Sequence, residues 1–201
     1  MTDTSGMTAQ QLLDELMAGN ARYVAGDLTS LNADLALIGQ ALDKEEPPHK
    51  PFAALLTCAD ARIPVEVIFE QIMGDLFVTR VAGNIATAEV IASIEYAVGV
   101  LESVKVIMVL GHRHCGAVKH TIKTTAAPGQ ISALYAPIRP AVILSPSPDE
   151  DATIKANARL QAILLRDASP VIAPLVKEGK LLVVAAYYDI VTGKVTPVPL
   201  A

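Results

Sequence analysis

The apolar positions along the chain alternate between short runs and helical repeats. Four short runs are predominantly apolar: 52–57, 76–81, 104–110 and 181–187. The first of them is apolar without alternation, as a strand buried on both faces is. Between the four runs, apolar residues recur at helical spacing over 65–73, 88–101, 115–124 and 153–168. Strands that alternate with helices predict an α/β fold with a central, mostly parallel β-sheet flanked by helices.

The amino-terminal segment has a helical pattern of its own. Apolar residues recur at helical spacing from Thr8 to Val24, and Thr8 is a candidate N-cap. The mixed stretch 31–46 suggests a second short helix, which Pro47 and Pro48 would end. We therefore expect residues 1–50 to form a helical arm that precedes the α/β core.

The remaining residues, 51–201, are expected to form that core. A Pro- and Ser-rich stretch, 126–151, separates two of the helical repeats, and we interpret it as a crossing loop with a short helix around 132–142. A length of 201 residues is within the usual size of one domain. Residues 1–201 are thus expected to form a single domain.

Composition and charge limit the kind of protein, its cellular location and its possible binding partners. Apolar residues make up 52% of the chain and charged residues 18%, which is typical of a packed globular protein. The chain has no apolar run of about 18 residues and no signal-peptide pattern at its start, so we expect a soluble cytoplasmic protein. A net charge of −5, without a stripe of Arg and Lys, predicts neither nucleic acid nor membrane as a partner.

Only two cysteines occur, and both follow predicted strands. Cys58 comes directly after the run 52–57, and Cys115 lies three residues after His112, where the run 104–110 gives way to a helical repeat. Because the carboxyl ends of parallel strands meet at one edge of a sheet, these side chains are expected to lie together. Two thiolates and an imidazole are ligands that zinc prefers. We therefore predict that Cys58, His112 and Cys115 bind Zn²⁺.

A simpler interpretation treats the same residues as structural. Free cysteine packs like a small hydrophobic residue, so both thiols could be inert groups of the core. Asp60 and Arg62, which follow Cys58 closely, could form an ordinary surface ion pair. The metal interpretation gains support because all of these groups fall at the same predicted edge of the sheet.

A zinc site with three protein ligands leaves a fourth position for water. Zinc lowers the pKa of that water to about 7, so a zinc-bound hydroxide is available as a nucleophile at neutral pH. Asp60, kept ionised by Arg62, would accept a hydrogen bond from the hydroxide and orient it. Arg62 would also hold Asp60 off the metal, since a freed carboxylate could become the fourth ligand of a closed site.

Four sequence motifs resemble those of the β-class carbonic anhydrases. They are, in order, Cys58 to Arg62 (CADAR), Gly74 to Asn84 (GDLFVTRVAGN), Ser93 to Val98 (SIEYAV) and Gly111 to Val118 (GHRHCGAV). The resemblance implies zinc-dependent, reversible hydration of CO₂ to bicarbonate and a proton, which is a lyase activity. It also implies that Cys58, His112 and Cys115 are the zinc ligands, and that Asp60 and Arg62 form the catalytic pair.

The resemblance further implies an architecture and partners. The family has a four-stranded parallel sheet, often extended by a fifth edge strand, and it assembles as dimers or tetramers whose N-terminal helices pack on a neighbouring subunit. CO₂ and bicarbonate would be the small-molecule partners. Tyr96 matches an aromatic residue that lines the substrate cleft in the family, although a core tyrosine is an equally good interpretation.

At several positions the chain departs from the family pattern. His49 stands where members often carry a glutamine thought to hydrogen-bond substrate, and it is a cleft candidate unless it is simply solvated. Leu55 and Thr57 stand where bicarbonate-regulated members have Trp and Gly, and the chain has no Trp, so we expect an open, non-allosteric site. His114, between the second and third ligands, is a candidate proton shuttle or a solvent-facing side chain.

Two other functions are compatible with the same residues. A zinc hydroxide could hydrolyse a CO₂ analogue such as carbonyl sulfide or carbon disulfide, a distinction that depends on the shape of the entry tunnel. A zinc-stabilised binding module without turnover is the third hypothesis. It predicts a damaged catalytic pair, whereas Asp60 and Arg62 are both present.

Overall fold

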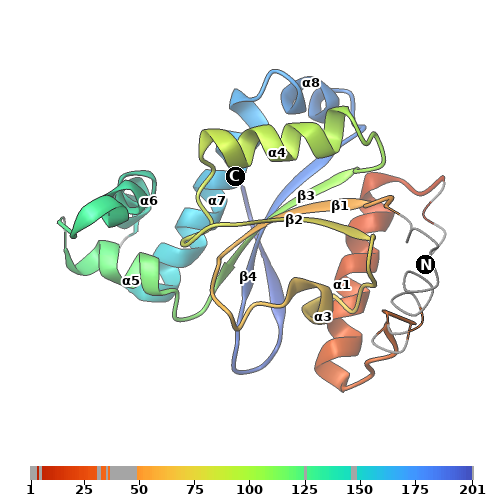
Figure 1. Cartoon of the computed structure of the whole chain (residues 1–201), viewed down its shortest axis with the longest axis horizontal. Coiled ribbons are helices and arrows are strands. Elements are labelled where there is room, and N and C mark those ends of the chain that lie inside the picture. Colours follow the sequence, from red (N-terminus) through yellow and green to blue (C-terminus); the bar gives the residue numbers. More distant parts are fainter. Residues whose placement is uncertain are drawn as a thin grey trace.

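A mostly parallel sheet forms the centre of the fold (Figure 1). In the computed structural model, the described residues are 4, 6–30, 33–34, 36, 49–124, 126–145 and 149–200. Among them, five strands are arranged in the order β2-β1-β3-β4-β5: β1 (Ala53–Thr57), β2 (Leu76–Arg80), β3 (Val106–His112), β4 (Leu182–Tyr188) and β5 (Val195–Val198). Strands β1 to β4 are parallel and β5 is antiparallel to β4, which confirms the predicted α/β fold and its edge strand.

Helices cover both faces of this sheet. They are α1 (Ala9–Ala25), α3 (Val65–Ile68), α4 (Ala88–Gly99), α5 (Gly116–Lys123), the 3₁₀ turn η1 (Gly129–Ile131), α6 (Ser132–Leu144), α7 (Glu150–Ala168) and α8 (Ile172–Lys177). Ala54 and Leu56 of β1 pack in the core cluster with α4, α7 and α8, whereas Ala53 and Leu55 pack in the cluster with α1 and α3. Every residue of β1 and β3 is buried, which explains why these two strands are apolar without alternation, whereas the residues of the edge strand β2 are only partly buried or exposed.

Helix α1 begins as the sequence predicts. The Thr8 hydroxyl oxygen accepts a hydrogen bond from the Gln11 backbone N–H at 3.3 Å, and the Gln11 side-chain oxygen accepts one from the Thr8 N–H at 2.8 Å. This capping box satisfies two N–H groups that the first turn would otherwise leave unpaired. Leu12 and Leu16 are buried in the core, so α1 packs on the sheet of its own chain.

Other parts of the arm stay predictions. Packing of the N-terminal helices on a neighbouring subunit concerns a partner chain, and the helix expected over 31–46 lies largely outside the described residues. Among the described residues, the arm is connected to the core by α1 and by two contacts beyond it: the Ser30 N–H donates to Glu70, and the Asp34 carboxylate accepts from the Met73 N–H at 2.6 Å.

Three helices differ from the sequence pattern. The helix predicted over 65–73 begins at Val65 as expected, but its predicted end is wrong, because α3 ends at Ile68 and Glu70 then adopts a left-handed conformation with φ of 50°. Helix α7 begins at Glu150, before the predicted residue 153, because the Asp149 carboxylate caps it by accepting from the Ala152 N–H at 3.2 Å. Helix α8 is a short element that no periodicity indicated.

The longest described helix, α7, has 19 residues and carries several charges, including Lys155 and Arg159. Within the described ranges, no helix is both long enough and apolar enough to cross a membrane. A cytoplasmic location stays a prediction from the sequence.

Candidate active site

Three ligand-type side chains meet at the carboxyl edge of the parallel strands. Cys58 directly follows β1, His112 is the last residue of β3, and Cys115 precedes the first residue of α5. Because β1 and β3 are adjacent and parallel, the ends of both strands lie side by side. The two sulfur atoms are 4.0 Å apart, and the ligand atoms of all three residues lie within 4.8 Å of one another. The predicted cluster is therefore present in the fold.

His112 is oriented so that one ring nitrogen faces the sulfur atoms. Its side chain is fully buried, and Nδ1 lies 2.9 Å from the carbonyl oxygen of Arg113. A carbonyl only accepts, so Nδ1 carries the proton and donates. Nε2 is buried without a hydrogen-bond partner among the described residues, which leaves its lone pair available to a metal.

The two thiols affect each other strongly because both are buried and close together. Hydrogen bonding from Cys115 is the main cause that lowers the pKa of Cys58, to about 4, although burial opposes it. Hydrogen bonding to Cys58 and burial raise the pKa of Cys115 well above its ordinary value. Cys58 is thus the more acidic thiol, and a cation between the two sulfurs would favour ionisation of both.

A carboxylate and a guanidinium lie beside this cluster. Arg62 donates to both oxygens of Asp60, from Nε at 2.9 Å and from a terminal nitrogen at 2.7 Å, and its backbone N–H donates to the same carboxylate at 3.0 Å. These bonds hold the pKa of Asp60 well below its ordinary range. Oδ2 of Asp60 lies 4.0 Å from Nε2 of His112, so the ionised carboxylate points toward the ligand cluster.

A second arginine, Arg80, supports the loop that carries these groups. Its Nε donates to the carbonyl of Cys58 at 3.1 Å, and a terminal nitrogen donates to the carbonyl of Asp60 at 2.6 Å. Arg80 is not among the site residues predicted from the sequence. Its place at the end of β2, which parallels β1, is the signal that would have pointed to it.

The other predicted site residues lie outside the ligand cluster. His114 has a half-exposed side chain whose Nδ1 is 3.4 Å from Glu150, while its carbonyl accepts from Arg62 at 3.4 Å. Tyr96 is 48% exposed on α4, with its ring 6.4 Å from that of Phe77, so the core-tyrosine interpretation is wrong.

His49 lies near the opposite end of β1 from Cys58. It is exposed and precedes the first residue of the strand, whereas Cys58 follows the last. Five strand residues alone span roughly 16 Å. The proposed contact of His49 with a substrate therefore requires the site of another subunit.

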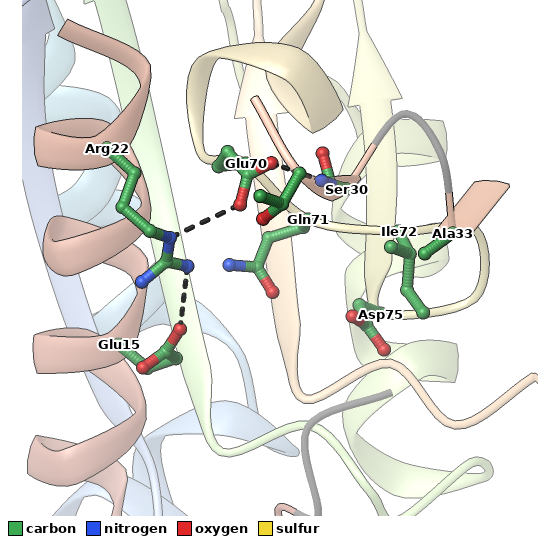
Figure 2. Close-up of a pocket in the computed structure, with 9 residues that line it drawn as sticks. Glu15, Arg22, Ser30, Ala33, Glu70, Gln71, Ile72 and Asp75 are labelled. Carbon is green, nitrogen blue, oxygen red and sulfur yellow. Dashed lines mark hydrogen bonds and ion pairs between the residues drawn. The ribbon is translucent and has the colours of Figure 1, made fainter. Parts of the chain in front are cut away.

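A separate charged pocket of about 430 Å³ lies between α1 and the segment that leads into β2 (Figure 2). In it, Arg22 of α1 donates to Glu15 at 2.9 Å and to Glu70 at 3.2 Å, and Figure 2 shows its guanidinium between the two carboxylates. We call Glu15, Arg22 and Glu70 the Arg22 cluster. Asp75, immediately before β2, also lines this pocket and is buried. None of the three candidate metal ligands lines the pocket.

Known proteins that match this chain in sequence are carbonic anhydrases, which agrees with a metal site at Cys58, His112 and Cys115. The family model described as carbonic anhydrase matches residues 53–195. Carbonic anhydrase 2 of Mycobacterium tuberculosis is 32% identical over 207 residues, which cover 96% of this chain and 93% of that protein. The carbonic anhydrase of Mycolicibacterium smegmatis is 43% identical over a shorter match that covers 53% of this chain and 50% of that protein.

Solved structures identify the class within that family. The β-carbonic anhydrase CcaA is 27% identical, with a TM-score of 0.67 and coverage of 93% of this chain and 87% of that one. A β-carbonic anhydrase from Sordaria macrospora, described as tetrameric, has the same fold at 23% identity, with a TM-score of 0.68 and coverage of 94% and 96%. The chain belongs to the β-class carbonic anhydrases, which are zinc enzymes.

Proposed function

We propose that the chain catalyses the reversible hydration of CO₂ to bicarbonate and a proton, with Zn²⁺ held by Cys58, His112 and Cys115. The observation that carries this proposal is the position of Asp60, an ionised carboxylate 4.0 Å from Nε2 of His112, which is buried and has no hydrogen-bond partner in the described part of the chain. Membership of the carbonic anhydrase family supports the choice of reaction.

The donor set suits zinc in number and in charge. Two thiolates and a neutral imidazole balance the charge of Zn²⁺ and leave one of its four usual positions open. When bound there, zinc would supply Lewis acidity and lower the pKa of a water molecule to about 7. Burial of all three ligands keeps competing solvent away from them.

Asp60 would orient the attacking oxygen. Its depressed pKa leaves it ionised at neutral pH, so its oxygens can only accept hydrogen bonds. Accepting one from the attacking water or hydroxide fixes the direction of the oxygen lone pair that reaches the carbon of CO₂. Asp60 in this role orients the nucleophile and does not remove its proton.

Arg62 would keep Asp60 in that position. Three hydrogen bonds from the side chain and backbone of this one residue hold the carboxylate. A carboxylate held in this way is less free to move onto the metal, which supports the open, non-allosteric site expected from the sequence. Asp60 as a fourth ligand would require these bonds to break.

The remaining roles are also part of the proposal. We place Tyr96 and His49 in the substrate cleft of a neighbouring subunit, because Tyr96 is exposed beside Phe77 near the amino end of β2 and His49 precedes the first residue of β1. Self-association as a dimer or tetramer is supported by the tetrameric relative. His114 as a proton shuttle has weaker support, since its imidazole contacts Glu150 instead. Residues 1–201 are proposed to form one domain.

The experiment that tests the function combines metal analysis with two substrates. The purified full chain should contain one zinc per subunit and should accelerate CO₂ hydration in a stopped-flow assay with a pH indicator. Release of sulfide from carbonyl sulfide or carbon disulfide should be slow by comparison. Zinc-loaded protein with negligible CO₂ turnover would overturn the proposal, and fast sulfide release in the same protein would favour the hydrolase instead.

A further inference from the structure

The turn after β2 brings a backbone N–H to one of the candidate metal ligands. The N–H of Asn84 donates to the carbonyl of Val81 at 2.9 Å and closes the turn, in which Gly83 has a φ of 79°. The left-handed conformation favours glycine, and a Cβ atom there would also lie 2.6 Å from Cδ1 of Ile138. In this conformation the N–H of Gly83 donates to the sulfur of Cys58 at 3.4 Å.

A hydrogen bond to a metal-bound thiolate changes the properties of the site. The donor stabilises negative charge on sulfur, and so it affects how strongly the thiolate donates electrons to a metal. The hydrogen bond from Gly83 to Cys58 persists only as long as the turn holds the Gly83 N–H in this position.

Asn157 of α7 holds this turn from the other side. It is fully buried, and its Nδ2 donates to the carbonyl of Gly83 at 2.8 Å. Its Oδ1 accepts from Gln161, one helical turn further on, at 3.3 Å. Gln161 in turn accepts from the N–H of Ala86 at 2.9 Å and donates to the carbonyl of Pro137 at 3.1 Å.

Buried amides at these two positions are costly unless their hydrogen bonds are made. Ile154 and Ala158, close to Asn157 on α7, are buried hydrophobic residues of the core, so an apolar residue at 157 would suit the surroundings. Each amide instead bonds the backbone of the segment 83–86. The two bonds differ in one respect: Asn157 holds the residue that touches Cys58, and Gln161 holds a residue three positions further on.

We propose that Asn157 is a positioning residue of the metal centre, which fixes Gly83 so that its N–H remains directed at the sulfur of Cys58. The inference rests on the proposed function only for the identity of the metal. Asn157 does not touch Cys58 itself. Gly83 connects them, because it accepts from Asn157 of α7 and donates to the ligand that follows β1.

Loss of the amide should be visible in the metal–sulfur bonds. Without Asn157, the buried carbonyl of Gly83 loses its partner, the turn can rotate, and the N–H can leave the sulfur. Changes of this kind around a metal ligand weaken metal affinity by about 10- to 100-fold. A thiolate without its hydrogen bond is a stronger electron donor, so the sulfur-to-cobalt charge-transfer band of Co²⁺-substituted protein should move to longer wavelength.

The test uses Co²⁺ with the full chain and two matched variants, Asn157→Leu and Gln161→Met. Each replaces a buried amide of α7 by an apolar side chain of similar size. Asn157→Leu should weaken Co²⁺ binding by about 10- to 100-fold, measured by competition with a chelator, and shift the charge-transfer band. Gln161→Met should lower thermal stability while affinity changes by less than about threefold and the band stays in place.

Several outcomes would overturn the inference. Unchanged affinity and spectrum in Asn157→Leu would do so, and so would an equal shift in Gln161→Met, since general loosening of the turn would then explain both. If Asn157→Leu does not fold, Asn157→Ala carries the same expectation, because alanine is the residue best tolerated in a helix. Cobalt binding is read without CO₂, so an inactive wild-type protein would count against the proposed function alone.

Discussion

Two clusters of carboxylate and guanidinium groups lie in different parts of the fold. Asp60 and Arg62 follow the carboxyl end of β1, and the Arg22 cluster lies between α1 and the segment that leads into β2. Both contain an arginine within 3.2 Å of a carboxylate oxygen. Charge pairing therefore does not distinguish them, and their surroundings do.

The difference lies in what each carboxylate can still do. Glu70 is buried and its two oxygens accept from Arg22 and from the N–H of Ser30, so its bonds join α1 to the residues before β2. Among the described residues, the Asp60 carboxylate accepts hydrogen bonds from Arg62 alone, and it faces Nε2 of His112, which has no hydrogen-bond partner there. We interpret the Arg22 cluster as a stabilising link between two segments, and Asp60 with Arg62 as the reactive pair, because of these two only the Asp60–Arg62 pair adjoins the candidate metal ligands.

The largest effect should come from removing a ligand. Cys115→Ser replaces a soft thiolate by a hydroxyl that stays protonated and binds zinc weakly. Zinc content, measured by mass spectrometry of the metal, should fall from about one to near zero per subunit, and CO₂ hydration should fall with it. Full zinc content and full activity in this variant would remove Cys115 from the site.

The next largest effect should come from Asp60→Asn, which keeps the shape and removes the charge. An amide paired with Arg62 cannot orient the nucleophile as a carboxylate does. We expect a loss of about 100-fold in kcat/KM for CO₂ hydration, with zinc retained. The depressed pKa of Asp60 places its ionisation below the range of pH 5 to 9, so the wild-type pH profile should show no step from this group there. A variant with normal kcat/KM would contradict the assignment.

Arg22→Met should affect stability and leave catalysis intact. Glu70 would lose its ion-pair partner while buried, which costs about 1–3 kcal/mol in the free energy of unfolding. Burial raises the pKa of Glu70 but its hydrogen bonds outweigh that, so the pKa is lowered overall. The stabilisation is therefore full above the ordinary pKa of about 4.5 and is lost as the pH falls. Urea unfolding of the variant and the wild type at several pH values measures this difference. An equally large loss of unfolding free energy at low pH would contradict the stabilising role of the Arg22–Glu70 ion pair.

The smallest effect is expected for Asp75→Asn in the same pocket. Burial raises the pKa of Asp75, so its ionised form is disfavoured in the folded protein and costs stability at neutral pH. The variant should raise the Tm by roughly 2 °C at pH 7. That gain should disappear as the pH falls through the raised pKa, because wild-type Asp75 then becomes neutral as well. A lower Tm at pH 7 would show that the charge is favourable there.

The sequence pattern predicted most of the fold, because burial of apolar side chains determines both the pattern of residues and the arrangement of strands and helices. Runs of apolar residues mark β1 and β3, and the ends of these runs locate Cys58 and His112 from the sequence alone. The capping box at Thr8 marks the start of α1 by local hydrogen bonds alone. Features that depend on local chemistry and burial are thus readable from one chain.

Features that depend on contacts between distant segments were not predictable. Helix α3 is short because Glu70 leaves the helical conformation and bonds to Arg22 and Ser30, which are 40 or more residues away in the chain. Asn157 looks like an ordinary polar residue of a helix, and its buried bond to Gly83 depends on how α7 packs. The support of the site is therefore visible only in three dimensions.

CO₂ hydration per bound zinc in Arg62→Met and Arg22→Met, measured side by side, is the most direct test of the difference between the two clusters. Each variant removes the guanidinium from one of the two clusters and keeps a side chain of similar length. We predict that Arg62→Met retains zinc and loses about 100-fold in rate, while Arg22→Met stays within about twofold of wild type. Wild-type activity in Arg62→Met, or an equal loss in both variants, would contradict the distinction between the two clusters.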